Sequence, residues 1–359
     1  MEKEILGTPN LLDEQGKLQT IGYSKHFNIR YNPQNIRVKH RLKEWDFYQI
    51  TNGEWCLQMN ISHLSYISSV GVTIFNIKTN VRYSLGKMKL FSRIALDDNN
   101  EKDHCITYRS GNHFEMKITV IGNKRNLAFL GSNKKYSLFT VNLELTALEN
   151  AESMVISIPF KNKPNHFYLN NKQNCFLASG EVKVNDEVIA FSPNNSFGLI
   201  DWGRGVWPYK NTWLWGNAST RLANGDLFGF NIGTGFGDLS QATENMFFLN
   251  GEAYKFGEIK ISFNQKDYLA PWYFTNNDNT CNLVMKPIYD NYTKTDFLIV
   301  RMACHQVFGL FSGEIILGDE KKIVLDQVFA FCEHCHNRWG NKIAYYHGNR
   351  YYFNSKKGW

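Results

Sequence analysis

The residues of this sequence best suited to chemistry in an apolar setting lie between Gly198 and Gly216. Four of the nine tryptophans fall there around a single acidic residue, Asp201, and they are Trp202, Trp207, Trp213 and Trp215. On a strand, Leu199 and Asp201 share one face, because successive side chains alternate between faces. A carboxyl group among indole and aliphatic groups is poorly solvated, so its pKa rises and it can act as a general acid.

The aromatic residues of this segment could stabilise the positive charge that such an acid would generate. Indole faces stabilise a carbocation by cation–π attraction, and Trp213 and Trp215 would share one strand face. Trp207-Pro208-Tyr209 is typical of a turn between two strands. The alternative is structural, in which Asp201 pairs with Arg204 and the tryptophans are core. The sequence leaves both interpretations open.

A second candidate segment, residues 329–339, contains Cys332, Cys335 and two histidines, His334 and His336, in the spacing Cys-x-x-Cys-His. Haem attachment at this spacing requires an exported chain, and a zinc ribbon requires a second Cys-x-x-Cys, which the sequence lacks. On a strand, alternation puts Cys332, His334, His336 and Arg338 on one face and Glu333, Cys335 and Asn337 on the other. The two histidines could bind a metal with a third ligand, but a hydrogen-bonded polar ladder lining a cavity is favoured, and no metal is predicted.

Two further patterns carry weaker signals. Gly233, Gly235 and Gly237 superficially resemble a phosphate-binding loop, but no helix pattern follows them, so we expect a tight sheet bend. Glu244 and Asn245 could form another polar pair inside a barrel. Because hydrolase, Walker and zinc-protease motifs are absent from the sequence, no cofactor is predicted.

The elements that must position these residues are strands. Apolar and polar residues alternate over residues 139–146, 181–185 and 259–264, with turn signals such as Asn224-Gly225 at short spacing. Helical patterns are nearly absent, which excludes a doubly wound parallel sheet. We therefore predict an all-β protein of two tandem antiparallel, lipocalin-like barrels or strongly curved sheets, divided into domains 1–190 and 191–359 at a segment rich in proline and asparagine.

Composition excludes several classes of protein. The 359 residues are 43% hydrophobic and 20% charged, enough to bury a core, so disorder is not the dominant state. The net charge is +7, but the basic runs are only pairs, which argues against a nucleic-acid partner. No apolar run is long enough for a membrane span, so integral membrane association is not expected. The acidic N-terminus is unlike a secretory signal, and seven scattered cysteines suggest reduced thiols in a cytoplasmic protein.

Several of these motifs together resemble a known family. The motifs are Leu11-Leu12-Asp13-x-x-Gly16-Lys-Leu18, Arg41-Leu-Lys-Glu-Trp45-Asp46-Phe-Tyr48, Asp201-Trp-Gly-Arg-Gly-x-Trp-Pro-Tyr209 with Trp213-x-Trp215-Gly, and Glu333-His334-x-His336-Asn337-Arg338-Trp339. The chain is similar in these segments to the domain-of-unknown-function family 2804, and the match runs from about residue 11 to residue 339. The family has no settled activity to carry over.

That family in turn resembles, at a distance, the carotenoid hydratase and tocopherol cyclase group. The resemblance implies a pair of lipocalin-like barrels, in which acidic residues protonate a carbon–carbon double bond in an apolar cavity. Asp201 matches such an acid in type and setting. Cys332 and Cys335 are not part of the family pattern.

The sequence therefore predicts a protein that binds a hydrophobic, lipid- or terpenoid-like molecule in an aromatic-lined β cavity. Acid-assisted isomerisation, hydration or cyclisation would follow, with Asp201 as proton donor and His334, His336 or Glu244 as relays. The ligand-binding candidates are Trp202, Arg204, Trp207, Tyr209, Trp213, Trp215, Glu333, Asn337 and Arg338. The alternatives are a binding protein without turnover and, more weakly, a metal-dependent enzyme using the two histidines. The oligomeric state is not predicted.

Overall fold

The computed structural model describes residues 2–297, 300–318 and 320–339. The regular secondary structure of these residues is antiparallel strand, apart from two short 3-10 helices, η1 (Pro33–Asn35) and η2 (Lys39–Arg41). The alternation of apolar and polar residues in the sequence corresponds to an alternation of buried and less buried side chains. Residues 139–146, for example, form a strand with this regular pattern. The predicted all-β fold of two curved antiparallel sheets is confirmed.

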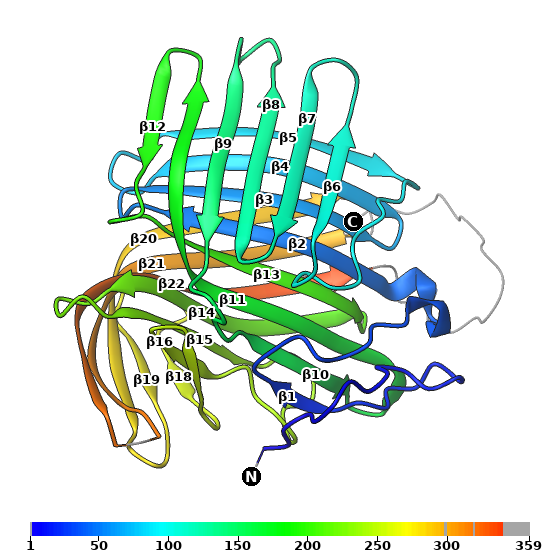
Figure 1. The fold of residues 1–359 in the computed structure, drawn as a ribbon, viewed down its shortest axis with the longest axis vertical. Coiled ribbons are helices and arrows are strands. Elements are labelled where there is room, and N and C mark those ends of the chain that lie inside the picture. Colours follow the sequence, from blue (N-terminus) through cyan, green and yellow to red (C-terminus); the bar gives the residue numbers. More distant parts are fainter. Residues whose placement is uncertain (1, 298–299, 319, 340–359) are drawn as a thin grey trace.

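Thirteen strands form the first sheet (Figure 1). Their bounds are β1 (Gly22–Ser24), β2 (Leu42–Thr51), β3 (Trp55–Leu64), β4 (Ile67–Asn76), β5 (Arg82–Leu90), β6 (His104–Arg109), β7 (Phe114–Ile121), β8 (Lys124–Gly131), β9 (Phe139–Thr146), β10 (Met154–Phe160), β11 (Lys163–Val184), β12 (Glu187–Phe191) and β13 (Phe197–Val206). The order along the sheet is β5-β4-β3-β2-β13-β11-β9-β8-β7-β6, and β10 and β12 also pair with β11.

The long strand β11 makes the first sheet curl. Its register against β13 shifts between Gln173 and Phe176, and Cys175 adopts a left-handed conformation with φ of 63°. Such a bulge bends the strand and increases its twist. The first half of β11 pairs with β10 and β13, and the second half with β9 and β12. In Figure 1 the strands β6–β9 therefore cross in front of β2–β5, and the main core lies between them.

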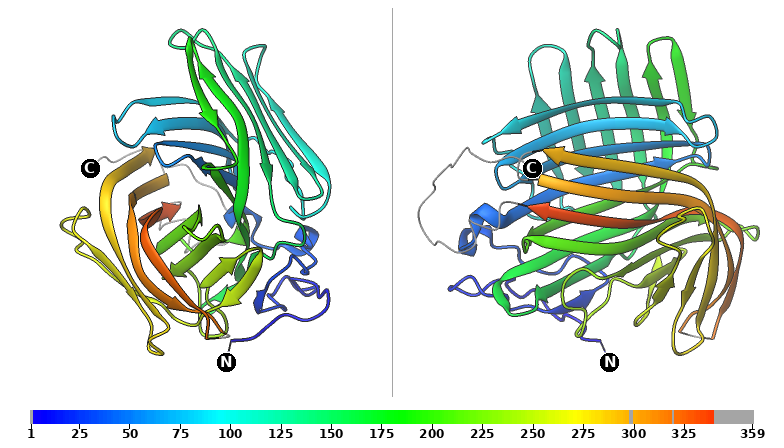
Figure 2. Two further views of the ribbon diagram at one scale, coloured as in Figure 1. Left: turned by 60° about the vertical axis from the view of Figure 1, so that its left-hand side comes forward. Right: turned by 180° about the vertical axis from the view of Figure 1, so that it is seen from behind.

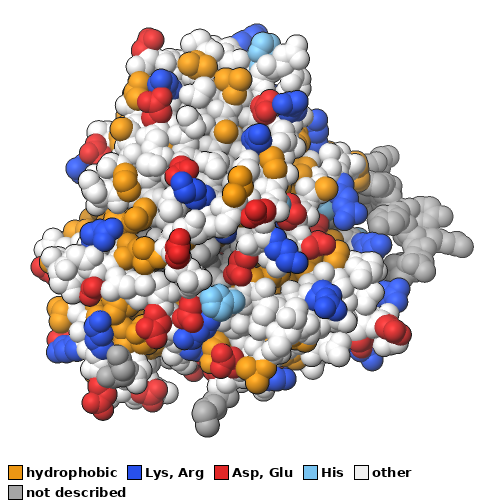
Figure 3. All heavy atoms as spheres, in the orientation of Figure 1, with side chains coloured by type: hydrophobic (Ala, Val, Ile, Leu, Met, Phe, Trp, Pro, Cys, Tyr) orange, Lys and Arg blue, Asp and Glu red, His pale blue; other side chains and the backbone are white. Residues whose placement is uncertain are grey.

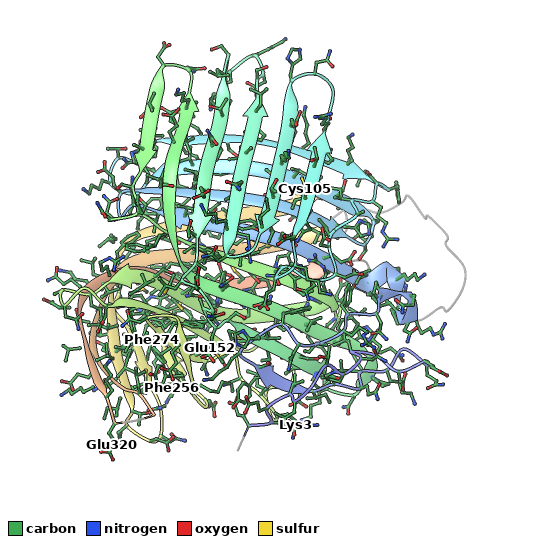
Figure 4. The ribbon with its side chains drawn as sticks, viewed as in Figure 1. Lys3, Cys105, Glu152, Phe256, Phe274 and Glu320 are labelled. Atoms are coloured by element: carbon green, nitrogen blue, oxygen red, sulfur yellow. A yellow bond between two sulfur atoms is a disulfide. The ribbon has the colours of Figure 1, made fainter. Side chains whose placement is uncertain are left out.

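Nine strands form the second sheet, in the order β17-β16-β15-β14-β22-β21-β20-β19-β18. Their bounds are β14 (Lys210–Arg221), β15 (Leu227–Thr234), β16 (Met246–Leu249), β17 (Glu252–Lys255), β18 (Lys260–Ser262), β19 (Trp272–Thr275), β20 (Cys281–Phe297), β21 (Val300–Ile316) and β22 (Lys322–Trp339). This sheet also curls (Figure 2). Its own core includes Phe256 and Phe274, which are labelled in Figure 4.

The two sheets pack against each other through their remaining faces. Leu199 of the first sheet shares a small buried cluster with Trp215, Phe308 and Phe331 of the second. Beside this cluster, Gln58 donates a hydrogen bond of 2.7 Å to Gln306. Each sheet thus packs one face against its own hydrophobic core, and part of its other face against the neighbouring sheet.

The chain passes from the first sheet to the second at residues 207–209, because β13 ends at Val206 and β14 begins at Lys210. The expected division at residue 190 assigned β13 to the second domain, whereas β13 pairs with β2 and β11 of the first sheet. The division into domains 1–190 and 191–359 stays a prediction, and the sheets change about sixteen residues later than it supposed.

The cysteines differ from expectation in one respect. Cys304 on β21 and Cys335 on β22 form a disulfide, so the expectation of reduced thiols is wrong for this pair. Of the free cysteines, Cys56, Cys175, Cys281 and Cys332 are buried and Cys105 is exposed.

Two observations concern possible partners. None of the helices in the described part of the chain has the length and apolarity needed to cross a membrane. On the face shown in Figure 3, acidic and basic side chains are interspersed, and no basic stripe runs across it. The absence of a nucleic-acid partner remains a prediction.

Candidate functional site

A cavity of about 280 Å³ lies between the two sheets. Its apolar lining comes from both, and consists of Trp45, Phe47, Leu64, Tyr168, Trp207, Trp213, Leu214, Trp215, Phe236, Leu239 and Met302. Its polar side chains are Asn60, Ser62, Lys172, Asp201, Thr234, Glu244, Glu333 and Asn337. A mostly apolar wall with a few convergent polar groups is the usual form of a small-molecule site.

Asp201 reaches the cavity from β13, where it lies between Lys172 on β11 and Phe47 on β2. The Asn170 amide donates a hydrogen bond of 2.6 Å to Asp201 Oδ1, and the Trp45 indole is a second hydrogen-bond partner. Burial raises the pKa of Asp201 above its ordinary value, while the Lys172 ammonium and the Asn170 hydrogen bond partly offset that rise.

Arg204 does not pair with Asp201. It lies on the opposite face of β13, where its guanidinium donates a hydrogen bond of 3.0 Å to Asp46 Oδ1 and lies over the Trp202 ring at 4.0 Å. Both Arg204 and Trp202 are fully buried in the core of the first sheet. The structural pairing of Asp201 with Arg204 considered from the sequence is therefore wrong.

Lys172 forms the second polar feature of the cavity. Its ammonium lies 2.5 Å from Glu244 Oε2 and donates to the Tyr168 hydroxyl at 3.3 Å. It also lies 4.8 Å from the centre of the Trp215 ring, a cation–π contact. The side chains of Lys172 and Glu244 are only 3% and 7% exposed, so this is a buried ion pair.

Glu333 and Asn337 extend the polar wall from β22. The Trp213 indole donates a hydrogen bond of 2.9 Å to Glu333 Oε1, and burial raises the pKa of Glu333 to about 7. Asn337 Oδ1 accepts a hydrogen bond of 3.1 Å from Asn211, and its buried amide nitrogen has no hydrogen-bond partner among the described residues.

Alternation decides which of the predicted residues reach the cavity. Those brought together there are Asp201, Glu244, Trp207, Trp213, Trp215, Glu333 and Asn337. Trp202, Arg204, Tyr209, His334, His336 and Arg338 are not among its lining residues. Tyr209 instead lies under the Arg41 guanidinium, 5.9 Å from the ring centre.

His334 and His336 alternate with Glu333 along β22 and therefore lie on its other face. There the ring nitrogen Nδ1 of His334 hydrogen-bonds the Tyr268 hydroxyl at 2.8 Å, and that of His336 hydrogen-bonds Thr212 at 2.9 Å. Burial lowers the pKa of His334 to about 4. Neither position supports a proton relay to Asp201.

The residues of the site that were not predicted from the sequence include Trp45, Tyr168 and Lys172. Lys172 falls in the polar run 170–174, which has the composition of a surface loop. In the fold this run is an internal part of β11, and Asn170 and Asn171 are completely buried. Trp45 lies in one of the motifs quoted above, which is the one signal that could have identified it.

One group of three metal-binding side chains comes together in the described part of the chain. It consists of Cys304, Glu333 and Cys335, whose ligand atoms all lie within 4.8 Å of one another. The two histidines considered from the sequence do not belong to it.

Comparisons with known proteins address the family and the fold. The family described as Domain of unknown function (DUF2804) matches residues 2–339. No curated protein matches the chain in sequence. Among solved structures, kievitone hydratase from Nectria haematococca has a TM-score of 0.51 and 12% identity, over 83% of this chain and 88% of that one. An ATTH-like protein from Nitrosomonas europaea has a TM-score of 0.46 and 12% identity, over 84% and 93%.

Proposed function

This chain belongs to the DUF2804 family, and from that premise and the geometry of the cavity we propose that it binds a compact apolar molecule between its two sheets and protonates it from Asp201. The ligand is lipid- or terpenoid-like, with an apolar body and one polar or unsaturated end. The observation that carries this proposal is the carboxyl group of Asp201, which pairs with no guanidinium of the described residues and lies against an aromatic cavity.

The cavity limits the class of ligand. Its volume of about 280 Å³ is near the lower end of the ~300–1,000 Å³ that small-molecule pockets span. The walls are aromatic and aliphatic, whereas Asp201, Lys172 and Glu244 gather close together. A mostly apolar wall favours a ligand with an apolar body, because polar groups buried against it without a hydrogen bond are costly.

The chemistry follows from the surroundings of Asp201. Burial raises the pKa of Asp201, so its carboxyl group holds a proton more readily than an ordinary aspartic acid, as a general acid requires. Proton transfer to a double bond generates a carbocation, which the faces of Trp213 and Trp215 would stabilise. Water addition, proton loss elsewhere or ring closure then gives hydration, isomerisation or cyclisation. The fold neighbour named a hydratase belongs to one of these reaction classes, and at 12% identity it supports the fold without assigning residue roles.

Binding without turnover is the second candidate, and one observation favours it. The Lys172 ammonium and the Asn170 hydrogen bond both favour the charged form of Asp201. A charged carboxylate would anchor a ligand hydroxyl rather than donate a proton. A metal-dependent reaction at His334 and His336 is not proposed, because both lie on the other face of β22 from Glu333.

Deuterium exchange distinguishes the two candidates without knowledge of the product. The protein is incubated in D₂O with a panel of terpenoid alkenes, binding is followed by tryptophan quenching, and deuterium uptake is measured by mass spectrometry. We expect quenching and deuterium uptake with wild type and with Asp186→Asn, an exposed control, and quenching without uptake with Asp201→Asn. Quenching without uptake in wild type supports the binding protein. No quenching by any alkene refutes both.

A further inference from the structure

Cys304, Cys335 and Glu333 lie together beside the cavity, which Glu333 lines, and the proposed reaction uses none of them. Cys304 on β21 and Cys335 on β22 are direct register partners, with their Cα atoms 4.1 Å apart. Glu333 precedes Cys335 by two residues and therefore shares its face. The neighbouring cross-strand pairs, Met302 with Asn337 and Gln306 with Glu333, contribute Met302, Asn337 and Glu333 to the cavity lining.

The donor set suits a particular class of metal ion. Two thiolates and one carboxylate match zinc, whose bonds are about 2.3 Å to sulfur and about 2.0–2.2 Å to oxygen. The three ligand atoms already lie within 4.8 Å of one another, and a tetrahedral ion would hold two sulfurs about 3.8 Å apart at that bond length. Reduction of the disulfide would free both side chains to rotate toward this separation, since their Cα atoms are register partners 4.1 Å apart.

The surroundings supply what a metal site needs beyond its ligands. Cys304, Cys335 and Glu333 are 5%, 0% and 9% exposed, so competing water is largely excluded. The Trp213 indole holds Glu333 Oε1 at 2.9 Å, the kind of outer hydrogen bond that orients a metal-binding carboxylate. Because three protein ligands leave the fourth position of a tetrahedral ion open, that position would face the cavity that Glu333 lines.

We propose that these three residues form a redox-controlled zinc site: the reduced pair binds one Zn²⁺ with Glu333, and the disulfide cannot. The disulfide takes up two electrons and two protons from a thiol reductant, which is itself oxidised to a disulfide. Each resulting thiol then releases its proton as it binds the ion. This proposal does not rest on the proposed function, although Glu333 lines the same cavity.

The structure also corrects which cysteines act together. The spacing Cys-x-x-Cys pairs Cys335 with Cys332 in the sequence, but Cys332 lies on the other face of β22, in the core of the second sheet. The partner of Cys335 comes instead from the neighbouring strand. Cys332→Ser is therefore a matched control, since it removes a buried cysteine of the same strand without touching the site.

The test compares zinc uptake by oxidised and by reduced full-length protein. Protein reduced anaerobically with a phosphine is dialysed against Zn²⁺ and its metal content is measured by mass spectrometry, with Co²⁺ as a spectroscopic probe of thiolate ligation. We expect one Zn²⁺ per chain in reduced wild type and reduced Cys332→Ser, and background levels in oxidised wild type and in Cys304→Ser. Glu333→Gln should weaken binding by about tenfold or more, since even outer partners of a ligand contribute that much.

Several outcomes would overturn the proposal. Equal zinc uptake by oxidised and reduced wild type would exclude redox control, and this comparison needs no substitution that could disturb folding. Wild-type uptake by reduced Cys304→Ser, or loss of uptake in Cys332→Ser, would assign the metal to other residues. A Co²⁺ complex without thiolate absorption would exclude the cysteines as ligands.

Discussion

The buried ion pair between Lys172 and Glu244 provides the sharpest test of the site's energetics. At 2.5 Å and an effective dielectric constant of about 20, the attraction between the two charges is about 6–7 kcal/mol. Most of it offsets the cost of removing both charges from water, so the pair itself adds little net stability. Removing one partner leaves the other buried and uncompensated, which typically costs about 3–5 kcal/mol.

We therefore expect Lys172→Met and Glu244→Gln each to lower the free energy of unfolding, Lys172→Met by the larger amount. The reason for the difference is that Lys172 also offsets the charge of Asp201, whereas Glu244→Gln leaves Lys172 with that second carboxylate nearby. The double variant should lose about 1–3 kcal/mol less than the sum of the single losses, because it buries no unpaired member of the pair.

The assay is urea unfolding followed by tryptophan fluorescence and circular dichroism, whose transitions must coincide for the free energies to be compared. If the loss in the double variant equals the sum of the two single losses to within about 0.5 kcal/mol, the coupling is refuted. The two side chains would then be solvated independently. A second readout is the pH dependence of deuterium uptake. Because the Lys172 ammonium lowers the pKa of Asp201, uptake by Lys172→Met should persist to higher pH than in wild type.

Three further predictions concern the residues around Asp201. Arg204→Met leaves Asp46 buried without its cation, so the free energy of unfolding measured in urea should fall by about 3–5 kcal/mol. The quenching of tryptophan fluorescence by the alkene panel should be unchanged in the folded variant. Gly203→Ala would place a Cβ 1.9 Å from the Trp45 ring, and we expect a loss of about 1–3 kcal/mol together with weaker quenching by the alkene panel. The pKa of Asp201 is raised in the fold, so its contribution to stability is full below its unfolded pKa of about 3.9 and is lost as pH rises through the folded value. Asp201→Asn should therefore gain stability relative to wild type as the pH rises above about 4, and a difference in urea midpoints that does not change with pH would contradict the raised pKa.

The sequence predicted the strands well because alternation is a local property. The faces of β22 were also predicted correctly, with Glu333 and Asn337 on one side and His334 on the other. What alternation cannot tell is which face of a strand meets the cavity, because that depends on strands distant in the chain. His334 and His336 were predicted as proton relays because imidazole suits that chemistry. The face of β22 that carries them is not the face that lines the cavity with Asp201.

Trp202 illustrates a different error. It was grouped with Asp201 because the two are adjacent in sequence, but adjacent residues of a strand point to opposite faces. Its ring packs edge-on against Phe27 at 4.9 Å in the core of the first sheet. Lys172 was missed for the converse reason, since a run of amide and basic residues is usually exposed. Its burial depends on partners such as Glu244, which lies 72 residues away.

The tryptophan-rich segment was informative because of where the chain crosses between the sheets. β1 to β13 belong to the first sheet and β14 to β22 to the second, so the described chain makes this crossing once, at residues 207–209. Asp201 precedes the crossing and Trp213 and Trp215 follow it, and β13 and β14 bring them to one cavity. Residues close to this crossing in the sequence therefore also lie close together in the fold, where their side chains point from β13 and β14 into the cavity. Glu244 and Glu333 lie further along the chain, and the folding of the second sheet brings them to the same cavity. Both were candidates from the sequence, whereas Lys172, the cation of the ion pair beside Asp201, was not.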